Sequence, residues 1–459
     1  MKSKADANKE TKEEGLALSK KKEKNTSLNW WQLSLLGVGC TIGTGYFLGS
    51  SIGIGLTGPS IVIAFLLAAL GTYVVFIALA KLTADDPQEG SFCYYAEQAF
   101  GNRVGFACGW NYWMSNILII GSQLTALSIL SRFWFDNVPL WVFASIYSLL
   151  GIGVVLLGTK GFDSVENVLA VVKTAAILLF IVLGFLAVFQ WLDGTGPDPS
   201  VPSSYNELFP RGIKGFWGSL IYAFYAFGGI EVIGLMAMQL KQKQDAPKSG
   251  TALLLLLAII YTVSLGLAVS MVSFDQFTDK ESPFVTALSD YHLAFFPHVF
   301  NAAIIVAGFS TMTAALFGVT TLLTTLAHDG NAPKWFEKKI KYKDLPLPSL
   351  GLAVVGLICA VIAALLLPGK LFEYITTAAG ILILFNWICI VLSNMRLLKQ
   401  TFFSISGNII GILLMLLAIS GILAEKTGRP GFYLSIGFAA IIVLIAWLVK
   451  KPHKEQSSS

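Results

Sequence analysis

The sequence predicts an all-α polytopic membrane protein with about twelve transmembrane helices. Of its 459 residues, 55% are hydrophobic and only 13% are charged. The mean hydropathy is +0.70, whereas soluble domains carry roughly 25% charged residues. The apolar residues gather into runs of roughly 18 to 28, long enough to cross a ~30 Å hydrocarbon core as helices. These runs do not alternate between apolar and polar residues, which excludes a membrane β-barrel.

Polar breaks divide the apolar sequence into twelve segments in order along the chain. They cover residues 31–52, 59–80, 103–131, 139–158, 164–191, 216–239, 251–273, 297–326, 349–367, 371–394, 402–424 and 431–449. We therefore assign the first five helices to residues 30–191, the next five to 192–394 and the last two to 395–450. Residues 1–29 and 451–459 are rich in Lys, Glu and Ser, so they are expected to be disordered tails.

The positive charges predict the orientation of these segments. With the N-terminus inside, 24 of the 32 lysines and arginines fall in inside segments and seven fall outside, while Lys173 lies within the fifth segment. Because Lys and Arg accumulate in cytoplasmic loops, both tails are expected to be cytoplasmic in a multi-pass protein of the cell membrane.

Several functional classes are disfavoured by composition and motifs. A net charge of +5 without a basic stripe disfavours nucleic-acid binding. The sequence contains no Walker A loop, no H-E-x-x-H and no serine elbow, so an enzyme is not expected. The five cysteines and four histidines have no metal-ligand spacing. No cofactor and no metal site are predicted.

Two of the twelve segments are interrupted by clustered glycines, which weaken a helix. The first holds Gly37, Gly39, Gly43, Gly45 and Gly49, and the sixth holds the adjacent pair Gly228 and Gly229 beside Glu231. Each glycine weakens a helix by about 1 kcal/mol relative to alanine. Small residues four apart in the first segment can also form a packing face, which is the competing interpretation. We favour broken helices because both interruptions begin a set of five segments.

Interruptions at corresponding places predict an inverted repeat with a binding site near the bilayer midplane. Unwound backbone within a membrane is tolerated where it lines a cavity. Exposed N–H groups at the start of a half-helix attract a carboxylate, and exposed carbonyl groups at the end of a half-helix attract an ammonium group or a cation. This pair of ends suits a zwitterion.

Four ordered stretches carry a family resemblance. They are GCTIGTGYFLG at residues 39–49 with a downstream Gly-Pro, PQEGSFCYY at 87–95, AFYAFGGIE at 223–231 and LLTTLAHDGNAPKWF at 322–336. At these residues the sequence resembles the amino acid permeases of the amino acid, polyamine and organocation transporter superfamily. The last stretch departs from the family pattern, because Thr320 and Thr321 stand where Ser-Arg is common.

The resemblance implies a leucine-transporter-type fold of five plus five helices in an inverted repeat, with two further helices and alternating access around an amino acid site. It places the substrate carboxylate at the first break, Thr41, Ile42, Gly43, Thr44 and Gly45. It places the substrate amine at the second break, Phe224, Ala226, Phe227, Gly228 and Ile230, with Phe227 closing over the substrate. Asn111, Ser115 and Asn386 are further pocket candidates.

The coupling ion is predicted from one buried lysine. An ionisable group within a membrane costs several kcal/mol unless it is paired or hydrated, although snorkelling to the interface is the alternative for Lys173. The resemblance places this lysine where sodium-coupled relatives hold a cation, which favours proton coupling. The hydroxyls of Ser310, Thr311 and Thr313 can line the same place and would serve sodium, or they can be ordinary interhelical donors. Glu231 is either a structural acid or part of proton movement.

The function predicted from the sequence is a secondary active permease for amino acids, with proton-coupled symport across the lipid bilayer. Because the candidate pocket offers no charged partner for a substrate side chain other than Glu231, neutral, apolar amino acids are the expected substrates. Sodium-coupled symport and amino acid exchange on the same fold remain alternatives. An amino acid sensor that does not transport and a channel are alternatives from other classes.

Overall fold

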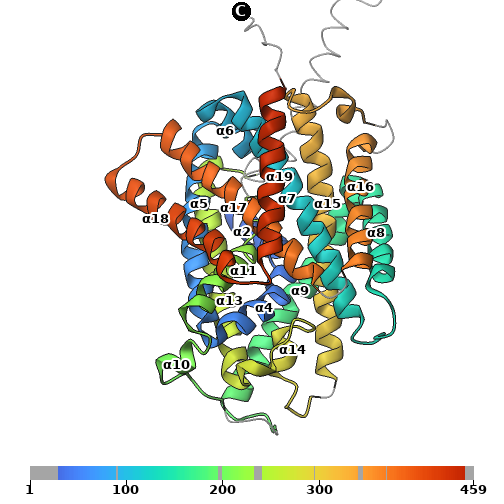
Figure 1. Cartoon of the computed structure of the whole chain (residues 1–459), viewed down its shortest axis with the longest axis vertical. Coiled ribbons are helices and arrows are strands. Elements are labelled where there is room, and N and C mark those ends of the chain that lie inside the picture. Colours follow the sequence, from blue (N-terminus) through green and yellow to red (C-terminus); the bar gives the residue numbers. More distant parts are fainter. Residues whose placement is uncertain are drawn as a thin grey trace, which may run out of the picture.

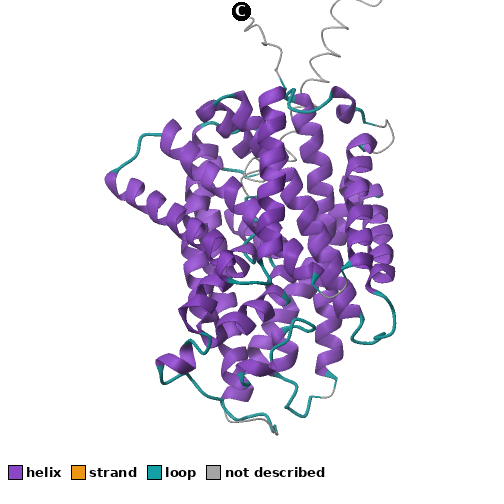
Figure 2. Cartoon of the chain, in the orientation of Figure 1, coloured by secondary structure: helices purple, strands orange, loops and turns teal. Residues whose placement is uncertain are grey.

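A computed structural model describes residues 29–88, 91–194, 199–231, 240–293, 295–339, 345–367 and 370–449. The predicted tails lie almost entirely outside the described residues, as do residues 232–239 of the sixth predicted segment. The described part is a bundle of long helices that run mostly along one direction (Figures 1 and 2). The C-terminal helix α19 ends at the same end of the bundle as α6, and α10 and α14 lie toward the opposite end (Figure 1).

The helices of the first half are α2 Trp30–Thr41, α3 Thr44–Phe47, α4 Gly49–Thr57, α5 Ile61–Asp85, α6 Ser91–Phe100, α7 Asn102–Ser131, α8 Leu140–Leu156 and α9 Gly158–Val188. Those of the second half are α10 Tyr205–Leu208, α11 Gly212–Tyr225, α13 Ala246–Met271, α14 Pro283–Ala287, α15 Phe296–His328, α16 Leu347–Leu366, α17 Leu371–Leu397, α18 Phe402–Gly421 and α19 Arg429–Leu448.

Five short 3-10 helices join or end these elements: η1 Gly58–Ser60, η3 Lys243–Asp245, η4 Phe274–Gln276, η5 Lys334–Glu337 and η6 Ile422–Ala424. The described residues form no β-strand, and an isolated antiparallel bridge links Gly194 with Tyr291. The all-α prediction is therefore confirmed for the described part of the chain.

Nine helical segments in the described ranges are long and apolar enough to cross a membrane. One of them runs from Thr44 to Asp85 through α3, α4 and α5, and α8 is a shorter apolar helix. These segments support a polytopic membrane protein. Each of the twelve predicted segments overlaps a helix, but the count of twelve spans and the inverted repeat stay predictions.

The helix boundaries follow local chemistry. Between α4 and α5 the chain turns at Gly58, whose φ of 69° lies in the left-handed region, and Pro59 then starts the next helical turn. Glycine adopts this conformation without a steric cost, and proline suits a first helical turn because it has no N–H to satisfy. The Gly-Pro pair therefore separates the first predicted segment from the second.

The centre of the bundle is formed by α7, which packs against α15, α17, α6 and α8, and by α13, which packs against α5, α2 and α9. Buried aromatic and aliphatic side chains fill this centre. The outer helices α8, α16, α18 and α19 instead expose large apolar side chains such as Leu149, Leu366, Leu413 and Leu448. Such a surface is costly in water, and it suits contact with lipid acyl chains.

Candidate functional site

The first break lies between α2 and α3. Helix α2 ends at Thr41, and Ile42 takes an extended conformation with φ −69° and ψ 110°. Gly43 is also extended, with φ −148° and ψ −166°, before α3 begins at Thr44. The Thr41 hydroxyl donates to the carbonyl oxygen of Gly37 over 2.9 Å and so stays within its own helix. The predicted interruption of the first segment is confirmed.

Gly43 is required by close packing rather than by its backbone conformation. A Cβ atom at this position would lie 2.8 Å from the Thr311 hydroxyl oxygen and 3.2 Å from the Gln123 amide nitrogen. Its φ lies in the extended region that any residue adopts. The break therefore sits directly against α7 and α15, where a larger side chain has no room.

Gln123 on α7 caps the N-terminus of α3. Its Oε1 atom accepts a hydrogen bond from the Thr44 backbone N–H over 3.3 Å and another from the Thr44 hydroxyl. The side chain is buried. Sequence reasoning missed Gln123, although an amide deep within the apolar segment 103–131 was an available signal, because buried polar groups need partners.

The second break follows α11. This helix ends at Tyr225, and the chain continues in turns through Glu231. The N–H groups of Phe227 and Gly228 donate to the carbonyl oxygens of Phe224 and Tyr225 over 3.0 and 2.9 Å. Gly229 has a φ of 105°, a conformation that other residues rarely adopt. The helix thus ends at the predicted place, and residues 232–239 beyond it lie outside the described ranges.

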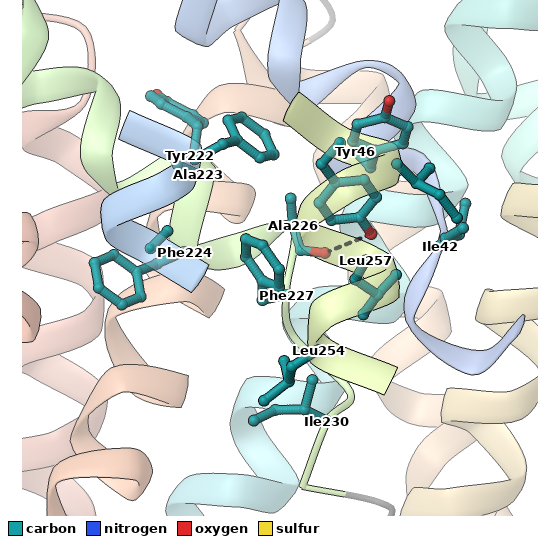
Figure 3. Close-up of a cluster of buried hydrophobic side chains, with 14 of the residues drawn as sticks. Ile42, Tyr46, Tyr222, Ala223, Phe224, Ala226, Phe227, Ile230, Leu254 and Leu257 are labelled. Atoms are coloured by element: carbon teal, nitrogen blue, oxygen red, sulfur yellow. Dashed lines mark hydrogen bonds between the residues drawn. The ribbon is translucent and has the colours of Figure 1, made fainter. Parts of the chain in front are cut away.

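The two breaks meet in the core of the protein. A Cβ atom on Gly45 would lie 2.7 Å from the ring of Tyr225, the last residue of α11. The ring of Tyr46 stacks on Tyr261 of α13 with centroids 4.0 Å apart, and the Tyr261 hydroxyl donates to the carbonyl oxygen of Ala226 over 3.1 Å (Figure 3). Tyr261 therefore connects the first interrupted segment with the second.

Apolar side chains surround this junction. Phe227 lies edge-on to Tyr261, with ring centroids 5.1 Å apart, and Ile230 is buried near Leu254 (Figure 3). Phe224 points away from Tyr46 in the same view, and its ring lies edge-on to that of Trp387 at 6.5 Å. Of the predicted substrate residues at the second break, Phe227 is therefore nearer than Phe224 to the aromatic side chains of the first break.

Glu231 is a buried acid with three hydrogen-bond donors. Its carboxylate accepts from the Tyr112 hydroxyl at 3.0 Å, the Trp387 indole N–H at 3.2 Å and the Gly229 backbone N–H at 3.2 Å. A buried carboxylate is costly unless donors of this kind satisfy it. The contact with Gly229 links the acid to the unwound backbone, in agreement with the structural role considered from the sequence.

Lys173 lies at the contact between α9 and α15, and its side chain is 0% exposed. Its amine donates to the Ser310 hydroxyl over 2.7 Å and lies 3.3 Å from Glu166 Oε1, with which it forms an ion pair. The Ser310 hydroxyl in turn donates to Glu166 Oε1 over 2.6 Å. Lys173 therefore faces the bundle interior, and the snorkelling interpretation is wrong for this conformation.

The remaining predicted residues have different surroundings. Thr311 and Thr313 donate to carbonyl oxygens of their own helix α15. Asn111 and Ser115 donate from α7 to the carbonyl oxygens of Leu382 and Ala379 on α17, over 2.8 and 3.2 Å. Asn111 and Ser115 therefore link the two central helices α7 and α17. Only Ser310 of the three predicted hydroxyls contacts Lys173.

Glu166 is a second residue that sequence reasoning missed. It lies seven residues before Lys173, which places both side chains on one face of a helix two turns apart. Among the described residues, no group of three or more His, Cys, Asp or Glu could hold a metal ion. The charged centre of the site is thus the pair of Lys173 and Glu166 with Ser310.

A polytopic helical bundle in which an interrupted helix meets the end of a second helix at its centre is typical of membrane transport proteins with discontinuous helices. A family model described as amino acid permease matches residues 32–449. The chain therefore belongs to the amino acid permease family of the amino acid, polyamine and organocation superfamily, a family of transporters rather than enzymes.

Individual relatives span most of this chain. The uncharacterized transporter YcgH of Bacillus subtilis (strain 168) is 49% identical over 446 residues, 97% of this chain and 100% of the relative. The uncharacterized amino acid permease YvbW of the same organism is 29% identical and covers 80% of this chain and 83% of its own. The aromatic amino acid transport protein AroP of Salmonella typhimurium (strain SL1344) is 27% identical, covering 90% and 92%.

Proposed function

We propose that this protein is a secondary active transporter that takes up amino acids by alternating access. The observation that carries this proposal is the meeting of the two breaks, where Gly45 lies against Tyr225 and Tyr261 bonds to Ala226. Discontinuous helices with this arrangement present backbone N–H and carbonyl groups to one another near the membrane centre. An α-amino acid carries a carboxylate that matches the N–H groups and an ammonium group that matches the carbonyl groups.

The substrate would lie between the two breaks with its charged ends on opposite sides. Backbone groups of the first break, from Thr41 to Gly45, would hold the carboxylate, and carbonyl groups from Phe224 to Ile230 would hold the amine. The Tyr261 hydroxyl occupies the Ala226 carbonyl in this conformation. Substrate binding at that carbonyl would therefore require the tyrosine hydroxyl to move or to share its acceptor.

The architecture that we propose around this site has twelve spans, with the first ten in two inverted sets of five. The break after Thr41 opens the first set, and the break after Tyr225 opens the second. Rocking of one set of helices against the other would expose the site to each side in turn. The proposed location is the cell membrane with both termini in the cytoplasm, on the strength of the positive charges.

Proton coupling is the proposed source of energy. The Lys173 amine is buried and donates to Ser310, so a positive charge already occupies the place in which a sodium ion would need oxygen ligands. A second cation at this place would be repelled. Sodium-driven symport is therefore the disfavoured alternative, and exchange of one amino acid for another would need no coupling ion.

Neutral, apolar amino acids are the proposed substrates. The side chains at the junction of the breaks include Tyr46, Phe227 and Ile230, which offer apolar surface and carry no charge. Aromatic amino acids belong to this class, and AroP is named for their transport. A large apolar substrate side chain would replace part of this aromatic packing, since aromatic pairs favour offset or edge-on contacts.

Uptake by purified protein in proteoliposomes tests the proposal. A panel of radiolabelled amino acids should reveal accumulation of leucine- and phenylalanine-like substrates when the proton gradient is directed inward, and not of lysine or glutamate. Lys173→Ala should abolish accumulation. Transport that requires sodium and ignores the proton gradient would overturn proton coupling, and the absence of any amino acid flux would overturn the transporter itself.

A further inference from the structure

The buried carboxylate of Glu166 has no role in the proposed function so far. It lies on α9 between Lys173 and the start of that helix at Gly158, and it is only 7% exposed. Its Oε1 atom carries two contacts, the ion pair with Lys173 and the hydrogen bond from Ser310. Its Oε2 atom is buried and has no hydrogen-bond partner among the described residues.

An unpartnered carboxylate oxygen in the interior is expensive, because it loses water without gaining a donor. Native proteins retain few such groups, and each one calls for an explanation such as a catalytic role or an unseen water. Packing alone does not require a carboxylate here, because an apolar side chain of the same size would fill the space at lower cost. A functional role for its charge would explain why a carboxylate is present at this position.

We infer that Glu166 is the proton acceptor of Lys173, with Ser310 as the hydroxyl that connects them; this inference rests on the proposed proton coupling. The direction of the hydrogen bonds fits such a relay. The Lys173 amine donates to the Ser310 oxygen over 2.7 Å, and the Ser310 hydroxyl donates to Glu166 over 2.6 Å. Both distances lie in the range of well-formed hydrogen bonds.

The transfer conserves atoms and charge. One N–H bond of the Lys173 ammonium breaks as that proton bonds to the Ser310 oxygen, while the original Ser310 hydroxyl proton passes to Glu166. The products are a neutral amine, an unchanged hydroxyl and a carboxylic acid. The ion pair becomes a neutral pair, so no isolated charge is left in the low-dielectric interior at any stage. The acid can then release its proton to water when that side opens.

The neighbouring helices α2, α8, α13 and α15 bring no further carboxylate to this pair. Helices α2 and α8 contain no charged residue. Helix α13 contains Lys248, which lies over the Trp30 ring at 4.2 Å, and α15 contains His298 and His328 near its two ends. Lys160 and Asp163 precede Glu166 on α9, and their side chains are outside the described part. Glu166 is therefore the one described acid that contacts the lysine.

The position of Glu166 gives the relay a direction. It lies seven residues nearer than Lys173 to the first residue of α9, or about 10 Å along the helix axis. The positive charges predict that this end faces the cytoplasm. Proton transfer from Lys173 to Glu166 would thus carry the proton toward the inside, in the direction of uptake.

Accumulation and exchange should separate in a Glu166→Gln variant. Proteoliposomes with an inward gradient of one pH unit would be given radiolabelled L-phenylalanine and L-leucine. One coupled proton can support about tenfold accumulation, since about 1.4 kcal/mol corresponds to a factor of ten. The wild type should approach this ratio, and Glu166→Gln should stay at the equilibrium level while still catalysing measurable counterflow exchange, which moves no net proton.

Two further variants keep the result interpretable. Glu166→Asp retains the carboxyl group and should retain proton-driven accumulation with a displaced pH profile. Thr174→Val, on the same helix, removes a hydroxyl that bonds only to Ala170 of its own helix, and it should behave as the wild type. If Glu166→Gln accumulates substrate as the wild type does, or if accumulation and exchange are lost together in both Glu166 variants, the relay is overturned. A wild type without proton-driven accumulation would instead overturn the proposed coupling itself.

Discussion

At the scale of single residues, the buried acid Glu231 is tied to the second helix break. Glu231 receives three hydrogen bonds, from Tyr112, Trp387 and Gly229, which belong to α7, α17 and the unwound segment. One side chain therefore connects three parts of the molecule that are distant in sequence. Charge-assisted hydrogen bonds are about twice as strong as neutral ones, so these contacts should contribute to the local shape of the second break.

Glu231→Gln should destabilise the protein by about 1–3 kcal/mol, because the amide nitrogen cannot accept a hydrogen bond and one buried donor loses its partner. Thermal unfolding of purified protein in detergent would measure the change. Tyr112→Phe removes one of those donors. The double variant Glu231→Gln with Tyr112→Phe should lose less stability than the sum of the losses in the two single variants. Additive effects would contradict the contact between these side chains.

Lys173 and Glu166 should be strongly coupled in stability. Lys173→Met leaves a buried carboxylate without its cation and should cost about 3–5 kcal/mol. A second change, Glu166→Leu, removes that lone charge and should recover much of the loss. Chemical denaturation in detergent micelles would compare the four proteins of this cycle, and an equal cost of Lys173→Met with and without Glu166 would rule out the ion pair.

At the scale of elements, the interruption of the first segment depends on close approaches of the backbone. Gly43 brings the chain against Thr311 and Gln123, and Gly45 brings it against Tyr225. A Cβ atom added to Gly49 or Gly55 of α4 would meet nothing within 4 Å. These four glycines therefore differ in role: Gly43 and Gly45 allow close contacts at the break, whereas Gly49 and Gly55 border open space.

Gly43→Ala should abolish or greatly reduce substrate uptake, because its Cβ atom would lie 2.8 Å from the Thr311 hydroxyl. Thr311→Ala removes both atoms that it would meet on this threonine and should restore part of the activity. Gly55→Ala is the matched control, and it should be tolerated and stabilise the helix by up to about 1 kcal/mol. Initial rates of amino acid uptake in whole cells, normalised to protein in the membrane, would distinguish these outcomes.

The breaks were predictable from the sequence, but their partners were not. Glycine in an apolar run is a local signal, so the interruptions near Gly43 and Gly228 could be placed from the residues alone. The contacts of Gln123 and Glu166 depend on how α7 and α9 are rotated against α3 and α15. Hydrophobic periodicity does not specify that rotation. The spacing of Glu166 and Lys173, two helical turns, was an available signal that became meaningful once both were known to be buried.

At the scale of the whole molecule, the distribution of burial agrees with a bundle surrounded by lipid. Side chains of α7 and α17 are mostly buried, whereas α8, α16 and α19 expose apolar faces. Because a bilayer satisfies no backbone group, any non-helical backbone at its centre must be enclosed by protein. Both breaks meet this condition, since Ile42, Gly43, Ala226 and Phe227 are buried.

The orientation of the bundle can be tested at the two ends of α15. Lys280 precedes this helix and Lys334 follows it, so they lie on opposite sides of one predicted span, and both are exposed. The excess of positive charge in the segments on the side of Lys334 predicts that this residue is cytoplasmic and that Lys280 is external. In intact cells, a membrane-impermeant maleimide should label Lys280→Cys and leave Lys334→Cys unlabelled until the membrane is permeabilised. The unsubstituted chain, with its native cysteines, provides the background. The reverse pattern would invert the topology, and with it the direction in which Glu166 would pass a proton.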